Sequence, residues 1–195
     1  MIENLTLRAI RERRSTLDFT SDPVTDEQVE AILEAGRWAP SARNSQPWDF
    51  VVVRDPQLRA GMAIILRRIT WAWGGFAAVP VMIVVSVDPS RDPDHFVEDG
   101  AVATQNLCLA AQSLGLASSW AGVYGSSRAA AGNVEQDLRA VLSLPPSHRI
   151  IAVVPIGLAK EQRESSRRPL TEMVHHDRFR PRLGSDLVAS TMPRG

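Results

Sequence analysis

Two almost entirely apolar stretches constrain the fold of this chain more than any other feature. Residues 81–87 read VMIVVSV, and residues 150–158 read IIAVVPIGL. Short runs rich in β-branched residues, without polar alternation, are typical of strands that are buried on both faces. We therefore expect two buried strands at the centre of the domain.

Helical patterns alternate with these strands. Thr25 and Gln28 have the spacing of a capping box, which predicts a helix that begins there and ends before Pro40. The alternation predicts a layered α/β or α+β domain, and the pattern alone leaves both open. The expected helices span residues 5–14, 25–39, 58–69, 95–114 and 133–142, and the expected extended segments span residues 49–54, 81–87, 118–123 and 150–158.

Composition limits the class of protein. The chain has 195 residues, 44% of them hydrophobic and 23% charged, which is ordinary for one soluble domain. A net charge of zero gives no field to attract nucleic acid. No apolar stretch is long enough to span a bilayer, and no apolar signal block is found near the N-terminus, so we predict a cytoplasmic protein. We expect residues 1–182 to form the domain and residues 183–195 a C-terminal tail.

Metal and disulfide chemistry are not predicted. Cys108 is the single cysteine, which excludes an intrachain disulfide and a cysteine-based zinc site. It falls on an apolar helix face, so we expect a buried packing residue. The acids of residues 92–99 lack the spacing of a calcium loop, and we interpret them as favourable charges at a helix N-terminus.

The most informative polar stretch is residues 40–48, which read PSARNSQPW between a helix and a strand. Ligand-binding loops are commonly placed there. The amide of Asn44 can both donate and accept hydrogen bonds, which suits a heterocycle with mixed edges. The alternative is a surface connector packed down by Trp48, and residue chemistry alone favours that alternative.

Two arginine pairs and one small-residue segment are weaker signals. Arg13, Arg14 and Ser15 have the groups to hold a phosphate, and Arg167 with Arg168 form a second pair. All but one of the 22 basic residues are arginine, so solvated surface charge is the alternative for each pair. Residues 114–122, LGLASSWAG, would let backbone amides approach a flat ligand, or would form a helix end followed by a core strand.

Taken together, these stretches resemble the nitroreductase family of flavin oxidoreductases. The matching strings are R-R-S-x-x-x-F at residues 13–19, P-S-x-x-N-x-Q-P-W at 40–48, L-G-L-x-S at 114–118 and R-P-L at 168–170. The resemblance covers roughly residues 5 to 180, and the string at 40–48 is the most specific.

The resemblance implies an α+β fold with a mixed central sheet flanked by helices, in an intertwined homodimer with residues 95–114 in the interface. It also implies FMN as cofactor, NADH or NADPH as co-substrate, and a small organic acceptor such as a nitroaromatic or a quinone. Because the cofactor carries the chemistry, no catalytic acid or base is assigned.

The family pattern also assigns cofactor contacts. Arg13, Arg14 and Ser15 would hold the phosphate and ribityl end of FMN, joined by Arg168 and Arg167. Pro40, Ser41, Ala42 and Asn44 would reach the flavin from the partner subunit. The backbone around Ser119, Ala121 and Gly122 would face the isoalloxazine.

One position departs from the family pattern. Leu17 stands where relatives usually carry a basic residue near the flavin, and positive charge there would stabilise reduced, anionic flavin. Arg43, Arg67 or Arg68 are the candidate replacements. The departure leaves open a relative with another flavin reaction, namely flavin fragmentation, dehalogenation or azoline oxidation, or a non-catalytic FMN-binding protein.

Overall fold

The computed structural model describes residues 2–69, 75–126, 133–161 and 164–180. They belong to two compact units, residues 1–163 and 164–195, which are treated separately below. The expected domain boundary at residue 182 lies outside the described residues. The elements are α1 (Leu5–Glu12), α2 (Asp26–Arg37), η1 (Ala42–Asn44), β1 (Trp48–Val53), α3 (Pro56–Leu66), α4 (Gly75–Ala78), β2 (Val81–Val87), α5 (Phe96–Ser113), β3 (Ala117–Ser118), β4 (Ala121–Gly122), α6 (Val134–Leu142), β5 (Arg149–Gly157) and η2 (Leu170–Glu172).

The first unit is built around one sheet with the strand order β1-β2-β5-β3, and β4 also pairs with β5. All of these pairs are antiparallel. A parallel element enters only as an isolated bridge between Ser15 and Ser118, within the part of the chain that the structure describes. The expected extended segment at 118–123 is therefore two short strands, both on β5.

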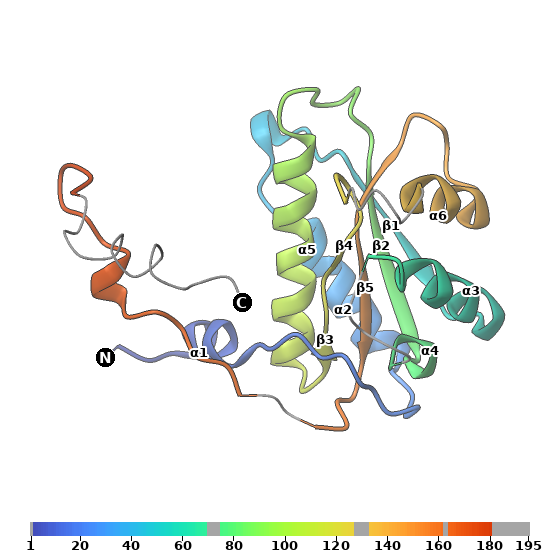
Figure 1. Ribbon diagram of the computed structural model, residues 1–195, viewed down its shortest axis with the longest axis horizontal. Helices are drawn as coiled ribbons and strands as arrows, with labels where there is room; N and C mark the ends of the chain where they lie inside the picture. Colours follow the sequence, from blue (N-terminus) through green and yellow to red (C-terminus); the bar gives the residue numbers. More distant parts are fainter. Residues whose placement is uncertain (1, 70–74, 127–132, 162–163, 181–195) are drawn as a thin grey trace, which may run out of the picture. The chain divides into compact units, whose positions relative to one another are not determined.

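Helices cover both faces of the sheet, which explains why every residue of β2 is buried (Figure 1). Ile83 and Val85 pack into a cluster with residues of α2 and α5, whereas Met82 and Val84 pack into a second cluster with residues of α3 and α6. Successive side chains of a strand point to opposite faces, so a strand between two helical layers has no solvated side. The layered α+β architecture predicted from the sequence is confirmed.

Local signals set the helix boundaries. The capping box of α2 is present, because the amide of Gln28 donates to Thr25 Oγ1 at 3.2 Å and the amide of Thr25 donates to Gln28 Oε1 at 3.0 Å. Asn133 caps α6 through a 2.9 Å bond from the amide of Gln136. The other predicted elements differ from the observed ones by up to three residues at their ends.

Helix α5 is the central helix of the first unit. A Cβ atom at Gly100 would lie 2.4 Å from Ile151 Cγ1, and one at Gly36 would lie 2.7 Å from Leu107 Cδ2. Glycine at these two positions therefore allows α5 to approach β5 on one side and α2 on another. Cys108 is buried in the same cluster, as expected from the sequence. No helix among the described residues is long and apolar enough to cross a membrane.

Candidate functional site

The arginine segment (residues 13–16) lies beside strand β3. Ser15 forms its parallel bridge with Ser118, and the amide of Thr16 donates to the carbonyl of Ser118 at 2.9 Å. This pairing fixes the backbone that carries the two arginines. The predicted phosphate-binding residues and the predicted small-residue segment are thus neighbours in the first unit.

Both arginines of this segment are half-buried. Arg14 donates to the backbone carbonyl of Arg13 at 2.9 Å, and neither guanidinium pairs with a carboxylate within the described ranges. A partly desolvated cation without an anion is an incomplete electrostatic arrangement. A phosphate would complete it, because guanidinium groups match its oxygens. The residues present therefore fit the phosphate end of FMN.

A pocket of about 310 Å³ opens beside the arginine segment. Burial raises the pKa of the Cys108 thiol, and this effect is larger than the opposite effect of the nearby Arg13 charge, which lowers the pKa. Cys108 therefore remains a neutral packing residue. The pocket is lined by Arg14, Thr16, Gln112, Gly115, Leu116, Ala117, Leu158 and Ala159.

The segment predicted to face the isoalloxazine turns most of its side chains inward. Ser119 and Ala121 are buried, and the amide of Ser119 donates to the carbonyl of Pro155 at 3.3 Å. Gly122 is exposed, and a Cβ atom there would meet only the Trp120 ring, at 3.7 Å. Gly122 is therefore the member of this set that offers open backbone to a ligand.

The site loop (residues 40–48) carries unusual backbone strain. Arg43, Asn44 and Gln46 have φ angles of 54°, 57° and 44°. A non-glycine residue in this left-handed region costs about 1–2 kcal/mol, although asparagine tolerates it better. Strain of this kind persists only where the surrounding structure enforces it, and it concentrates at functional sites.

One buried carboxylate enforces much of this conformation. Asp99, in the first turn of α5, accepts a hydrogen bond from the amide of Ala42 at 3.0 Å and another from the hydroxyl of Ser45 at 3.2 Å. Its side chain is 4% exposed. The two bonds lie on either side of the left-handed residues Arg43 and Asn44.

Further bonds within the loop decide which groups stay free for a ligand. The hydroxyl of Ser41 accepts from the amide of Gln46 at 3.0 Å, and the amide of Ala42 is already bound to Asp99. The side-chain amide of Asn44 is exposed and has no hydrogen-bond partner in the described part of the chain. Of the predicted flavin-lining residues in this loop, Asn44 is the one whose polar side chain remains available.

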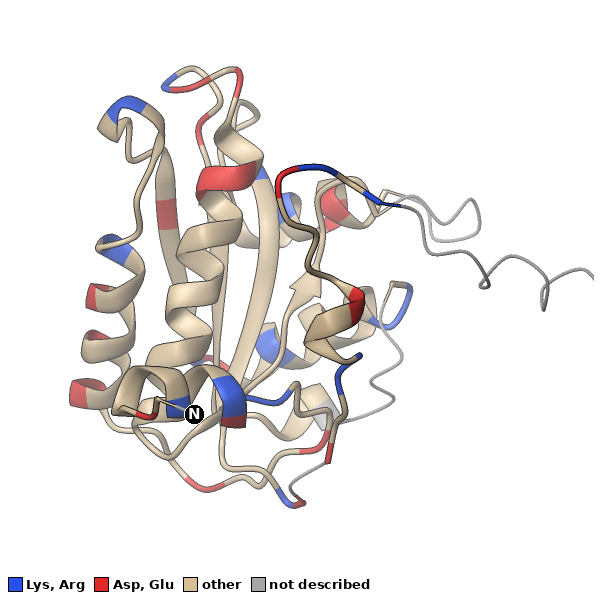
Figure 2. Cartoon of the chain, turned by 90° about the vertical axis from the view of Figure 1, so that its left-hand side faces the viewer, with Lys and Arg blue, Asp and Glu red and all other residues tan. Residues whose placement is uncertain are grey.

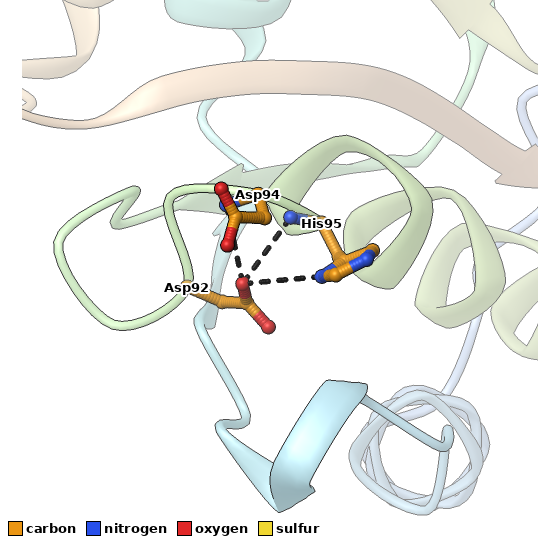
Figure 3. A group of neighbouring side chains, drawn as sticks. All are labelled: Asp92, Asp94 and His95. Atoms are coloured by element: carbon orange, nitrogen blue, oxygen red, sulfur yellow. Dashed lines mark hydrogen bonds and ion pairs between the residues drawn. The ribbon is translucent and has the colours of Figure 1, made fainter.

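Asp92, Asp94 and His95 form a cluster near the same end of α5 (Figure 3). Their possible ligand atoms lie within 4.8 Å of one another, the spacing of a metal site. However, Oδ1 of Asp92 accepts from the amides of Asp94 and His95 at 3.2 Å each and faces the His95 ring at 3.4 Å. Asp92 Oδ2 is buried, has no hydrogen-bond partner among the described residues, and points away from the other two side chains. The Asp92 side chain thus closes a turn in the loop just before α5, which begins at Phe96, and this turn accounts for the arrangement.

The hydrogen bonds to Asp92 govern its ionisation. Burial would raise the pKa of this carboxyl, but the amides of His95 and Asp94, the His95 ring and the charge of Arg43 together outweigh burial and leave the pKa below its ordinary value. The ionised carboxylate also pairs with Arg43 of the site loop at 3.3 Å. The side chain of Arg43 is 70% exposed, so this second link to the loop is weak.

The arginine segment and the site loop lie at opposite ends of α5 (Figures 1 and 2). The loop bonds to Asp99 in the first turn, and the pocket beside the arginine segment includes Gln112 near the last turn. At 1.5 Å per residue, these two positions are about 20 Å apart along the helix. One chain therefore does not bring the two predicted halves of the site together.

The second arginine pair belongs to the second unit. Arg167 and Arg168 are exposed, and Arg167 donates to the carbonyl of Ser166 at 2.8 Å. Their contribution to a phosphate site stays a prediction, because the structure describes them only within residues 164–180.

Leu17 is partly buried and packs against the core cluster that contains Phe19. The position that is basic in the family is thus apolar here. Of the candidate replacements, Arg43 pairs with Asp92 and Arg68 pairs with Asp137. Arg67 has no acidic partner in the ranges that the structure describes, so its charge is the least neutralised of the three.

Comparison with known proteins decides the family. A sequence model of the nitroreductase family matches residues 10–72 and 66–158. The chain belongs to this family. The resemblance inferred from the four sequence strings is therefore confirmed.

Three proteins illustrate what this chain is similar to. A protein of Archaeoglobus fulgidus, named as an NADH dehydrogenase/NAD(P)H nitroreductase, is 35% identical over 81% of this chain and 87% of its own. A nitroreductase of Desulfovibrio desulfuricans, solved in complex with FMN, is 34% identical with a TM-score of 0.75, covering 92% of this chain and 100% of its own. The NADPH:FMN oxidoreductase of Vibrio harveyi, solved with NAD⁺, is 25% identical with a TM-score of 0.78, covering 96% and 83%.

Sequence reasoning missed the residues that shape the site loop. Asp99 and Asp92 were interpreted only as favourable acids at a helix N-terminus, which is their effect on α5 itself. Their contacts reach residues 42–45, about fifty positions earlier in the chain. One signal was available, because five polar residues between two prolines need partners to hold a fixed conformation.

Proposed function

We propose that this protein is a homodimeric, FMN-dependent oxidoreductase that transfers electrons from NADH or NADPH to a small organic acceptor, such as a nitroaromatic or a quinone. Family membership supports the reaction class, and the FMN and NAD⁺ complexes of the relatives support the cofactor and the co-substrate.

The separation of the two half-sites along α5 carries the proposal. A two-fold axis perpendicular to α5, near the middle of the helix, makes the α5 helices of the two copies antiparallel. The site loop of one copy then lies beside the arginine segment of the other. Each half-site is incomplete alone, since among the described residues the cations of one have no acidic partner and the side-chain amide of Asn44 in the other has no hydrogen-bond partner. A flavin between them would meet both.

Different groups of residues then bind different parts of the cofactor. Arg13, Arg14 and Ser15 bind the phosphate and ribityl end, together with Arg168 and Arg167 of the second unit. Ser119, Ala121 and Gly122 place backbone along one face of the ring. A second copy supplies Pro40, Ser41, Ala42 and Asn44, where Ser41 and Ala42 act by shaping the loop and Asn44 by bonding to the ring edge.

Bound FMN supplies the hydride and electron chemistry, and the protein supplies binding, orientation and electrostatics. None of the residues assigned above acts as a catalytic acid or base. Donor and acceptor would use the same cleft in turn, because a flavin held against β-strand backbone has one open face.

The visible absorption spectrum of the purified protein tests the proposal most directly. We expect flavin bands that bleach on addition of NADH or NADPH under anaerobic conditions and return when a nitroaromatic or quinone is added. Cofactor released by heat should match FMN and not FAD. A protein that binds FMN without being reduced by either nicotinamide cofactor would be a flavin-binding protein without this activity.

A further inference from the structure

We propose that Asp99 is a positioning residue for flavin binding: its carboxylate holds the site loop in the strained conformation that presents Asn44 to a flavin on the second copy. This inference rests on the proposed function, because it assigns the loop's ligand to FMN. Asp99 touches neither cofactor nor substrate in this assignment and acts through the loop.

The geometry of the two bonds is the basis of the proposal. Oδ1 of Asp99 accepts from the amide of Ala42, and Oδ2 accepts from the hydroxyl of Ser45, at 3.0 and 3.2 Å. Both oxygens of one carboxylate are therefore used, one before and one after the residues with φ of 54° and 57°. A carboxylate in this position acts as a clamp across the strained turn.

The burial of Asp99 makes the clamp strong. Hydrogen bonds to a charged acceptor shielded from water are worth more than neutral or exposed ones. Glu98 in the same turn of α5 is exposed and makes no hydrogen bond to the loop among the described residues. The two acids are thus equivalent for the helix dipole but differ in contact with the loop.

This difference supplies a matched control. Asp99→Ala and Glu98→Ala each remove one negative charge from the first turn of α5 and leave a good helix former. We expect the FMN dissociation constant of the dimer, measured by quenching of flavin fluorescence, to rise about tenfold or more in Asp99→Ala. It should change by less than about twofold in Glu98→Ala. Circular dichroism at the titration temperature verifies that each variant is folded.

Smaller changes test the clamp itself. Ser45→Ala removes only the partner of Oδ2 and should weaken FMN binding less than Asp99→Ala does. Adding Arg43→Gly to Asp99→Ala should recover part of the affinity, because glycine adopts a φ of 54° without strain. Arg43→Gly in the otherwise wild-type protein is the control, because relieving the strain at residue 43 can by itself stabilise the loop. If Asp99→Ala fails to fold, Asp99→Asn and Ser45→Ala carry the same comparison with Glu98→Gln.

The outcomes separate the two proposals. A wild-type protein that binds no FMN overturns both. Wild-type binding with equal dissociation constants in Asp99→Ala and Glu98→Ala overturns only the role of Asp99. A weakened Asp99→Ala that Arg43→Gly does not improve also overturns it, since the loop conformation would then not be what Asp99 supplies.

Discussion

The two regions at the ends of α5 are built in opposite ways. The arginine segment has ordinary backbone paired with β3, and its charges have no acidic partner among the described residues. The site loop has strained backbone, and most of its polar groups are already bonded within the protein. The arginine segment therefore contributes positive charge from an unstrained backbone, whereas the site loop contributes a fixed shape that requires a strained backbone. A ligand with an anionic end and a rigid ring needs both.

The largest effect is expected when the arginine segment and the site loop are inactivated in different subunits of one dimer. An Arg13→Ala, Arg14→Ala double variant loses the charge, and Asn44→Gly loses the amide while keeping the positive φ. Each variant alone should bind FMN poorly. In a mixture with free subunit exchange, about half of the dimers are mixed, and each has one intact site, so about a quarter of all sites should recover wild-type affinity.

Fluorescence titration of the mixture before and after subunit exchange measures this recovery. Mixing wild type with either variant gives the calibration. No tight sites after verified exchange would mean that both halves serve one flavin from the same chain, and the shared-site arrangement would be wrong.

Removal of single charges should have the next largest effect. Arg13→Ala and Arg168→Ala should each weaken FMN binding about tenfold or more, because a charge-assisted bond is worth roughly 1.5–3 kcal/mol. Arg8→Ala is the control, since Arg8 pairs with Glu12 on the exposed face of α1. Unchanged affinity in Arg13→Ala would show that the arginine segment is solvated surface charge and does not bind FMN. Unchanged affinity in Arg168→Ala alone would show only that the second unit does not contribute to the site.

The next prediction concerns the effect of charge at residue 17 on the midpoint potential of bound FMN. If no other cation replaces the family's basic residue, the midpoint potential of bound FMN should be lower in the wild type than in Leu17→Arg, because positive charge favours the electron-rich reduced form. Potentiometric titration with FMN saturating measures both. Leu17→Met controls for repacking against the core.

Equal potentials in that titration would indicate that Arg67 or another group already supplies the field. A lower potential in Leu17→Arg would show that residue 17 is misplaced relative to the flavin.

The smallest expected effect concerns the weaker link between Asp92 and the loop. The folded pKa of Asp92 is lowered, so its ionised form stabilises the protein above the ordinary pKa of about 4, and this contribution is lost as the pH falls through the lower folded value. Urea unfolding between about pH 3 and 6 should show a steeper loss of stability at the acid end for wild type than for Asp92→Asn.

Asp94→Asn is the matched control for Asp92→Asn. Asp94 is exposed, and its side chain makes no hydrogen bond to the site loop among the described residues. Parallel stability curves for wild type and Asp92→Asn would show that the hydrogen bonds to Asp92 do not stabilise its charge.

The sequence by itself determined the local elements and the chemical groups of the site. Residues 81–87 form a strand with the predicted bounds, because a continuous β-branched run suits a strand between two layers. Thr25 caps its helix as predicted, and Asn133 caps the helix that was predicted to begin at residue 133, since capping needs only residues a few positions apart. The family strings likewise named Arg13 and Asn44 without any knowledge of where they lie.

Tertiary structure alone decided how these groups are arranged. The strand order β1-β2-β5-β3 and the clamp of Asp99 on the site loop join residues many tens of positions apart, which no local pattern encodes. The length of α5 sets the distance between the two half-sites, and the close packing at Gly36 and Gly100 holds that helix in place. Long-range packing, and not residue type, therefore makes Asp99 a partner of the loop and leaves Glu98 exposed to solvent.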